Sequence, residues 1–189
     1  MRGQQSQAEE MVAAAREFAK KAHEGLKRPN KAQDPYWTHL KDVADLVEAA
    51  GGTPWEIAAA WLHDTVEDTS TTLEEIRVIF GAEVAHTVDG LTDPPHFTGM
   101  PTLERKTLQA QRVVHKDKSV KLVKLADQTS NVRSVTSDPP VDWTPQKCRD
   151  YIDGARLIAE ECKDASPVLY VEFCKAYKAA DRIYPKSAV

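Results

Sequence analysis

The sequence predicts an all-α protein, folded as a single domain over residues 1–189. Apolar side chains recur every three or four residues along most of the chain, which is the spacing of one face of a helix. Alternation of apolar and polar residues, which is typical of strands, never extends beyond a few residues. Residues that cap helices precede proline at Thr53, Thr144 and Ser166. We expect a core over about residues 8–180, with frayed ends at residues 1–7 and 185–189.

The composition is that of a globular protein without a general affinity for polyanions. The 189 residues are 41% hydrophobic and 29% charged, enough for one sizeable core. A net charge of −4 argues against a DNA, RNA or membrane-surface binder, yet it permits a local basic pocket. Three cysteines, Cys148, Cys162 and Cys174, form neither a CxxC pair nor a disulfide framework, so we expect a cytoplasmic protein. No apolar run is long enough to span a membrane, and the N-terminus lacks the apolar core of a secretory signal.

Helices in the first half of the chain are bounded by glycine, proline and capping residues. Residues 8–25 have one apolar face and end at Gly25. A basic loop over residues 27–31 precedes a second helix, which Gly51 and Gly52 end. Thr53, Pro54 and Glu56 then form a capping-box start for a helix that carries residues 57–67.

Helices in the second half follow the same logic. Thr72 and Glu75 form another capping box, Gly81 interrupts the pattern, and a helix covers residues 82–91. Residues 92–101 contain three prolines and a glycine and are expected to be a loop. The remaining predicted helices begin at the cap Thr102, cover residues 119–135, and begin at Thr144-Pro145 and Ser166-Pro167.

The stretch Trp61–Asp68 concentrates ionisable side chains in an apolar frame. His63 and Asp64 are adjacent, and Glu67 and Asp68 follow one helical turn later. On a continuous helix, residues four apart share a face, so His63 would lie beside Glu67 and Asp64 beside Asp68. Desolvating such groups among apolar neighbours is unfavourable without a compensating cation. The stretch therefore predicts a metal site.

Two further residues are candidates to complete that site. His39 stands at the entrance of a helix, after an aromatic pair that can fix its position. Asp127 lies in the largely apolar segment 120–131, where an unpaired carboxylate is unfavourable. Two imidazoles and two carboxylates suit Mn, Fe or Zn better than Ca. Asn131 is one turn after Asp127 and shares its face, so it can hydrogen-bond a substrate beside the metal.

Each candidate also has a structural interpretation. A single histidine such as His39 is more often structural than a ligand, and Asp127 can pair with Lys124 three residues earlier. Asn131 can bond its own helix, the Glu67-Asp68 pair can begin a polar turn, and the basic loop can be a solvated surface. The other histidines are expected to be structural or surface residues: His23, His86, His96 and His115. The joint pattern decides between the interpretations.

That joint pattern resembles the HD hydrolase superfamily, whose signature is a distant His, an adjacent His-Asp and a later Asp. More narrowly, the chain is similar to small alarmone hydrolases and to the hydrolase domain of bifunctional RelA/SpoT enzymes, which form helical bundles. The matching segments keep the family order: Ala15–His23, Asp34–His39, Ala60–Thr69, Leu103–Lys106 and Val120–Arg133. The motif HDTVEDT, followed by KLVKLAD and an Asn four residues later, is specific to this branch.

The resemblance implies a role for each candidate. It implies that two histidines and two aspartates bind one ion, Mn²⁺ or another divalent transition metal: His39, His63, Asp64 and Asp127. It implies that Glu67 and Asp68 are the catalytic acidic pair. Substrate contacts are expected from basic, amide and aromatic side chains: Lys27, Arg28, Lys106, Lys124, Asn131 and Tyr151.

The implied activity is metal-dependent hydrolysis of the 3′-pyrophosphate of ppGpp or pppGpp, which releases pyrophosphate and GDP or GTP. Glu67, helped by Asp68, would orient the attacking water and accept its proton. One alternative is an HD-type phosphohydrolase acting on an adenine alarmone, NADPH or a dNMP. Another is a non-catalytic nucleotide sensor, which the acidic pair argues against. We expect a monomer or small homo-oligomer whose partner is the nucleotide, with no DNA, RNA or membrane partner.

Three departures from the family pattern stand outside the metal set. Leu40 follows His39 where a proline is usual, and the loop at residues 27–33 is about one or two residues longer. Gln128, with Thr and Ser after it, replaces a more usual Lys with bulky neighbours. The longer loop and the altered segment leave the preference for guanine or adenine open.

Overall fold

A computed structural model of the chain describes residues 2–186, with side chains described from Ser6 onward. Between these residues the regular elements are helices and no strand is formed, which confirms the predicted all-α class. Two isolated β-bridges join loop residues, Lys27 with Pro35 and Asn30 with Pro140. No helix in the described part of the chain has both the length and the apolar character needed to cross a membrane.

The helices follow the predicted order. They are α1 (Arg2–Ala22), α2 (Trp37–Ala49), α3 (Pro54–Leu62), α4 (Thr65–Asp68), α5 (Leu73–Phe80), α6 (Ala82–Leu91), α7 (Thr102–Val113), α8 (Lys118–Ser137), α9 (Pro145–Cys162) and α10 (Pro167–Ile183). Two 3₁₀ segments, η1 (Pro95–Phe97) and η2 (Lys163–Ala165), lie in the connections.

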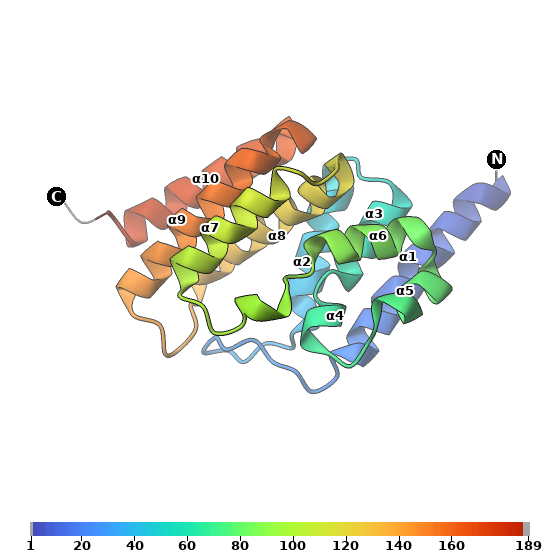
Figure 1. Ribbon diagram of the computed structural model, residues 1–189, viewed down its shortest axis with the longest axis horizontal. Helices are drawn as coiled ribbons and strands as arrows, with labels where there is room; N and C mark the ends of the chain where they lie inside the picture. Colours follow the sequence, from blue (N-terminus) through green and yellow to red (C-terminus); the bar gives the residue numbers. More distant parts are fainter. Residues whose placement is uncertain (1, 187–189) are drawn as a thin grey trace.

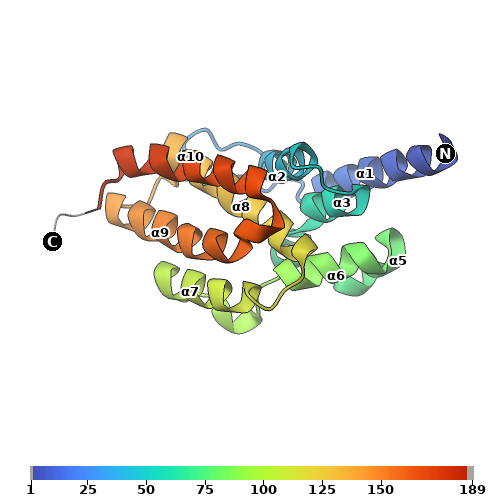
Figure 2. The ribbon, with the colours of Figure 1, turned by 90° about the horizontal axis from the view of Figure 1, so that it is seen from above.

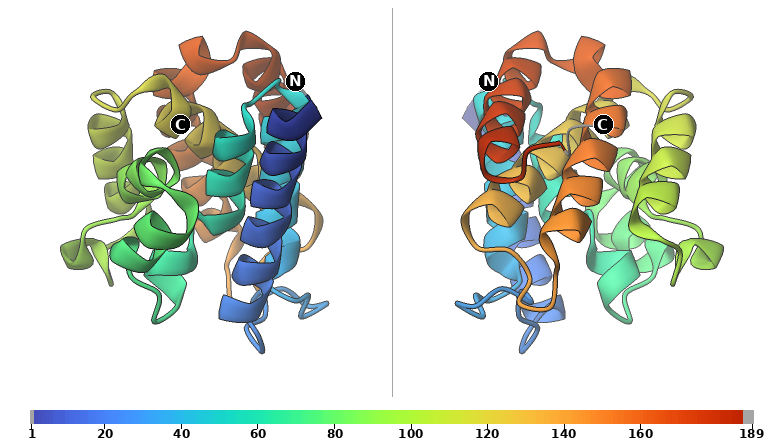
Figure 3. Two further views of the ribbon diagram at one scale, coloured as in Figure 1. Left: turned by 90° about the vertical axis from the view of Figure 1, so that its right-hand side faces the viewer. Right: turned by 90° about the vertical axis from the view of Figure 1, so that its left-hand side faces the viewer.

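Helix α8 lies in the middle of an elongated bundle. Figures 1 and 2 place α1, α3, α5 and α6 toward one end and α7, α9 and α10 toward the other. Helix α8 packs against α3 and α6 of the first group, against α9 and α10 of the second, and against α2. Seen from the two ends in Figure 3, α1 runs along one side of the bundle and α7 along the opposite side. The two ends of the bundle are therefore joined through α8.

Burial of α8 extends around most of its circumference. Val120, Leu125 and Val132 belong to the apolar core, as expected for a helix that is apolar on several faces. The same helix also buries polar side chains, among them Asp127 and Ser130. Because buried polar groups need partners, these residues mark the part of α8 where a site is built.

The predicted capping residues explain where four of the helices begin: α3, α5, α9 and α10. Thr53 and Thr72 each form the capping box with a glutamate three residues later. Thr144 and Ser166 accept hydrogen bonds from backbone amides in the first turns of α9 and α10. The predicted cap at Thr102 is wrong, because Thr102 is itself the first residue of α7 and no side chain caps that helix.

The helix predicted to carry the central motif without interruption is broken in the structure. Helix α3 ends at Leu62, and His63 and Asp64 form a turn before α4. The His63 Nδ1 atom lies 2.8 Å from the carbonyl oxygen of Ala60 and donates a hydrogen bond to it. In a continuous helix the amide of Asp64 would donate to this same oxygen. Asp64 accordingly has φ −96° and ψ −3°, outside the regular helical values.

The termini of several elements also differ from the predictions. Helix α1 begins at Arg2, earlier than the start expected at residue 8; glutamine is a good helix former that an apolar pattern does not report. Gly25, at φ 81°, lies in the turn after α1 rather than in the helix. Asp117 caps α8, which no pattern predicted. Residues 185 and 186 follow α10 without helical structure, while residues 1 and 187–189 lie outside the described part.

Candidate active site

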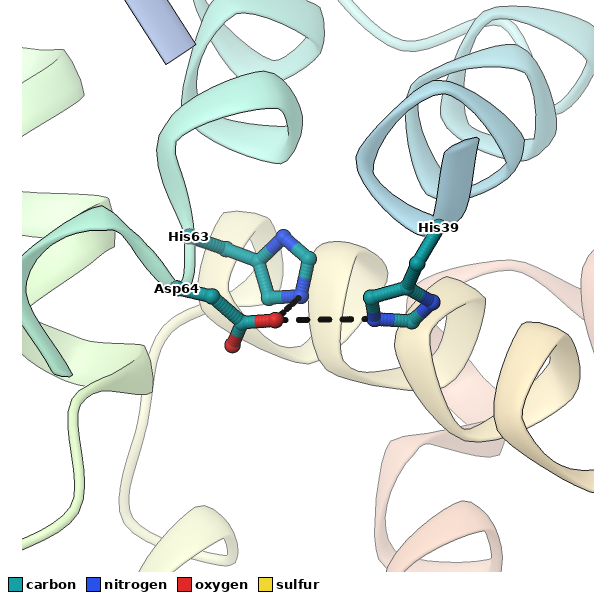
Figure 4. Close-up of side chains that lie close together, drawn as sticks. All are labelled: His39, His63 and Asp64. Atoms are coloured by element: carbon teal, nitrogen blue, oxygen red, sulfur yellow. Dashed lines mark ion pairs between the residues drawn. The ribbon is translucent and has the colours of Figure 1, made fainter. Parts of the chain in front are cut away.

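Three segments that are distant in the sequence bring two imidazoles and a carboxylate together. His39 lies in the first turn of α2, and His63 and Asp64 lie in the turn between α3 and α4. Figure 4 shows both imidazoles directed at the carboxylate, with α8 behind them. The Asp64 Oδ2 atom is 3.6 Å from His39 Nε2 and 3.1 Å from His63 Nε2. One ligand atom from each residue lies within 4.8 Å of the others.

Asp127 adds a second carboxylate from the middle of α8. Its Oδ1 atom is 3.5 Å from His39 Nε2 and 3.9 Å from His63 Nε2. The side chain is buried, and Lys124 Nζ lies 3.3 Å from its Oδ2 atom, so the ion pair considered for these two residues is also formed. The four candidate ligands therefore lie side by side, and their role as ligands stays a prediction.

Hydrogen bonds at the far side of each imidazole orient the two rings. His39 Nδ1 lies 3.0 Å from Ser130 Oγ, and His63 Nδ1 lies 2.8 Å from the Ala60 carbonyl oxygen. Because a carbonyl only accepts, His63 Nδ1 carries a proton, so Nε2 is the ring nitrogen that can present a lone pair to a cation. That Nε2 atom is buried and has no hydrogen-bond partner among the described residues. A cation at this point would satisfy it.

The charges of the four side chains favour a cation. Burial opposes ionisation of the carboxyls, but His63 lowers the pKa of Asp64 and Lys124 lowers the pKa of Asp127. Burial also lowers the pKa of His39, so this imidazole is neutral. Burial acts in the same direction on His63, but the neighbouring Asp64 raises its pKa to about 9, so a metal at Nε2 would displace a proton held there in its absence. Ionised oxygens and ring nitrogens in one place form a donor set for a divalent metal.

The acidic pair of α4 lies beside this cluster. Glu67 and Asp68 line the same polar cavity as His39, Asp64 and Asp127, and the cavity has a volume of about 210 Å³. Burial and the charge of Asp64 raise the pKa of Glu67 to about 7, and the same two causes raise the pKa of Asp68. A carboxylate with a pKa near neutrality is suited to exchange protons. We call the cavity that Glu67 and Asp68 line the metal-side cavity.

A second cavity of about 220 Å³ adjoins the first. Four residues line both cavities: Tyr36, Arg105, Asn131 and Tyr151. The second cavity has more apolar walls, and the rings of Trp143 and Tyr151 lie 5.0 Å apart in it, measured between centroids. We call this the aromatic cavity. Polar and aromatic compartments that share a wall suit a ligand with a charged end and a flat ring system.

The predicted substrate contacts are distributed unevenly over the two cavities. Lys106 and Lys124 line the metal-side cavity, and Asn131, which lines both, donates a hydrogen bond to Asp127 Oδ1. Arg28 lines the aromatic cavity. Lys27, in contrast, is exposed and lines neither cavity.

The sequence patterns gave no contact with the candidate ligands or the substrate to Tyr36 or Arg105, both of which line the site. The Tyr36 hydroxyl donates a hydrogen bond of 2.8 Å to Asp64 Oδ2, and Arg105 lines both cavities. Tyr36 precedes His39 by three residues, and Arg105 precedes the predicted contact Lys106, so proximity along the chain was the available signal.

The fold and the site define a helical protein with a buried cluster of two histidines and two aspartates. The family model described as an HD domain matches residues 15–149, so the chain belongs to the HD-domain family. The resemblance inferred from the HD motif and its partners is thereby confirmed.

Several known proteins are similar to the chain over most of its length. Guanosine-3′,5′-bis(diphosphate) 3′-pyrophosphohydrolase MESH1 from Xenopus tropicalis is 34% identical, and the alignment covers 84% of this chain and 88% of that protein. The Homo sapiens protein of the same name is 38% identical, with coverages of 82% and 86%. The structure matches that of a metazoan orthologue of SpoT that hydrolyses ppGpp, with a TM-score of 0.82, 25% identity and coverages of 89% and 94%.

Proposed function

We propose that the chain is a metal-dependent 3′-pyrophosphohydrolase of ppGpp and pppGpp, which releases pyrophosphate and GDP or GTP. The observation that carries the proposal is the position of Glu67 and Asp68 beside the buried His-His-Asp cluster, in a cavity that adjoins an aromatic one. The names of the similar MESH1 proteins support the same reaction.

The residues of the cluster fit a divalent cation. The unpartnered Nε2 atom of His63, the neutral His39 and two ionised carboxylates form a mixed nitrogen and oxygen donor set. Such a set suits Mn, Fe or Zn, and we propose Mn²⁺, held by His39, His63, Asp64 and Asp127. A bound ion of this kind lowers the pKa of a water molecule and offsets negative charge on a phosphate.

Glu67 is the proposed base. Its raised pKa, about 7, reflects burial and the charge of Asp64, and a bound cation shifts the pKa down again, so that the carboxylate is ionised at neutral pH. The ionised carboxylate accepts a proton from the attacking water, and Asp68 orients the same water. A nucleotide sensor has no use for such a pair.

Binding of the highly charged substrate is assigned to side chains around the two cavities. Lys124 and Lys106 face the metal-side cavity, where they offset the charge of the 3′-pyrophosphate. Arg28 and Tyr151 line the aromatic cavity, which takes the nucleoside, and Asn131 lies between the two compartments. We assign no contact to Lys27.

A product assay tests this function. The purified protein, loaded with Mn²⁺, is incubated with ppGpp, pppGpp, an adenine counterpart, NADPH and a dNMP, and the release of pyrophosphate and phosphate is measured. We expect pyrophosphate together with GDP or GTP. Release of phosphate from NADPH or a dNMP instead would establish a different phosphohydrolase. Binding of ppGpp without turnover at any divalent metal would establish a sensor.

A further inference from the structure

Hydrolysis of a 3′-pyrophosphate needs a proton for the nucleoside oxygen that leaves, and the function proposed above names no donor for it. The inference below rests on that proposed function. In phosphoryl transfer the attacking and leaving oxygens lie roughly in line on opposite sides of the phosphorus. With the pyrophosphate in the metal-side cavity and the nucleoside in the aromatic cavity, the leaving 3′ oxygen lies where the two cavities meet.

Lys106 is placed at that junction by packing between α7 and α9. Its Nζ atom lies 3.9 Å from the centroid of the Tyr151 ring, and Tyr151 lines both cavities. Lys106 itself lines the metal-side cavity, and its neighbour Arg105 lines both. The ammonium therefore stands against Tyr151, a wall that the two cavities share, where a leaving oxygen needs its proton.

We propose that Lys106 is the general acid, giving a proton from Nζ to the 3′ oxygen of the nucleoside. The water oxygen forms a bond to the phosphorus while the bond from phosphorus to the 3′ oxygen breaks. The electron pair of that bond goes to the 3′ oxygen, which takes the proton of Lys106 and leaves as a hydroxyl. Glu67 keeps the proton of the water, and exchange with solvent returns both groups to their starting states.

The surroundings of Lys106 hold its amine in one place. The side chain is 2% exposed, and Nζ donates a hydrogen bond of 2.7 Å to Gln128 Oε1. A second N–H faces the Tyr151 ring, and because an ammonium has three N–H donors, one remains for the substrate. Gly154 of α9 makes room for the stem: a Cβ there would lie 2.6 Å from both Cβ and Cδ of Lys106.

The other proton carriers of the metal-side cavity are less suited to this step. The Tyr36 hydroxyl already donates to Asp64, and burial raises the pKa of Tyr151. Lys124 is ion-paired with Asp127, which together with Asp93 raises its pKa despite its burial. A guanidinium such as that of Arg105 does not release a proton in proteins.

The charge balance around Lys106 supports the role without deciding it. The charged and titratable groups near it come from α7, α8, α9 and the loop before α7: Asp93, Arg105, Lys124, Asp127 and Tyr151. Burial lowers the pKa of Lys106 to about 7, against the effect of Asp127, which raises it. An amine that titrates near neutrality gives up its proton more readily than an exposed lysine.

A change of leaving group separates a proton donor from a residue that only binds the substrate. The Lys106→Met variant is assayed with ppGpp and with an analogue in which sulfur replaces the bridging 3′ oxygen. A thiolate leaves without protonation, whereas the alkoxide does not. We expect kcat on ppGpp to fall about 100-fold or more, in the ~10²–10⁴ range of general acids, and kcat on the sulfur analogue to fall at least ten times less.

Lys118→Met, at an exposed lysine outside both cavities, is the matched control and should leave both rates within about twofold. Equal losses on the two substrates in Lys106→Met would overturn the proposal and leave Lys106 as a binding residue. An unmodified protein that binds Mn²⁺ but hydrolyses neither substrate would contradict the proposed function itself, which is a distinguishable result.

The pH profile of the unmodified protein gives a second measurement, which does not depend on whether a substituted protein folds. The acid must be protonated, so kcat on ppGpp should decline as the pH rises through the pKa of Lys106 in the complex. The sulfur analogue should show no such decline. A decline of the same midpoint on both substrates would overturn the assignment.

Discussion

The imidazole of His63 both ends a helix and prepares a ligand atom. Its Nδ1 atom donates a hydrogen bond to the Ala60 carbonyl oxygen, which is then not used by the backbone, and helix α3 ends just before this residue. The same bond fixes the tautomer and turns Nε2 toward Asp64, where it is buried without a hydrogen-bond partner. One side-chain bond therefore couples the local backbone to the chemistry of the site.

The proposed base can be tested by an isosteric change. In Glu67→Gln the amide keeps the size of the side chain but cannot accept a proton, so we expect kcat on ppGpp to fall about 10²–10⁴-fold while Mn²⁺ remains bound. The measurements are kcat and the metal content of the purified variant. Glu74→Gln, at an exposed glutamate paired with Arg77, is the control and should retain full activity. Full activity in Glu67→Gln would remove this residue from the mechanism.

The pKa of Glu67 also predicts a pH dependence. The base acts when deprotonated, so kcat should rise with pH through the pKa of Glu67, on the acidic side of the decline expected from Lys106. Burial and Asp64 raise that pKa to about 7 without a cation, and a bound cation lowers it, so the rise should lie below pH 7 in the loaded protein. The profile of kcat on ppGpp from pH 5 to 8 measures it. A rate that is flat over this range would be inconsistent with Glu67 as the base.

Tyr36 is predicted to act through a metal ligand rather than on the substrate. Its hydroxyl donates to Asp64 Oδ2, the oxygen nearest to both imidazoles, and its ring stacks on His23 at 5.1 Å between centroids. Removing the hydroxyl in Tyr36→Phe should lower Mn²⁺ affinity by about 10–100-fold, measured by calorimetry. Tyr170→Phe, whose hydroxyl bonds Glu160 away from the site, should bind Mn²⁺ normally. Unchanged affinity in Tyr36→Phe would show that the hydrogen bond does not hold the ligand.

At the scale of the elements, helix starts that depend on local hydrogen bonds were predictable, and breaks that depend on side-chain placement were not. The capping boxes at Thr53 and Thr72 depend only on two residues three positions apart, so they can be predicted directly from the sequence. The interruption after Leu62 depends on where the His63 ring lies, which a hydrophobic pattern does not encode. The cap at Thr102 failed because a capping residue type is not by itself evidence of a cap.

The same distinction holds for the site. The ligand candidates were predictable because a motif relates His63 and Asp64 to distant partners, and buried polar residues stand out in apolar helices. The position of Arg105 and the presence of the aromatic cavity were not predictable, since they depend on how α7 packs against α9. The resemblance implied that Lys27 and Arg28 both contact the substrate, and of the two Arg28 is the one that lines a cavity.

Helix α3 leads into the His63-Asp64 turn, and its cap should contribute measurably to stability. Thr53 accepts the Glu56 amide, and Glu56 also accepts a hydrogen bond from Ser119 Oγ of α8. Thr53→Ala should reduce the free energy of unfolding by about 1 kcal/mol, measured by urea denaturation. Thr102→Ala, where the side chain caps nothing, is the control and should change it by less than about 0.5 kcal/mol. Equal effects of the two substitutions would contradict the assigned cap.

For the molecule as a whole, the cluster joins segments that the backbone does not connect directly. His39 belongs to α2, the His63-Asp64 turn follows α3, and Asp127 belongs to α8, which packs against both ends of the bundle. A cation held by all of them binds the folded chain and not the unfolded one. Its binding free energy is therefore added to the stability of the entire bundle.

A thermal experiment measures this contribution. Mn²⁺ at 100 times its Kd should stabilise the fold by about 2.7 kcal/mol, which corresponds to a rise in Tm of about 5–10 °C for a protein of this size. A chelator should reverse the rise. His39→Ala should abolish it because a ligand is lost, whereas His115→Ala, at an exposed histidine, should preserve it. If Mn²⁺ raised the Tm of the His39→Ala variant as much as that of the unmodified protein, the cation would be bound elsewhere, and the cluster would not be the metal site.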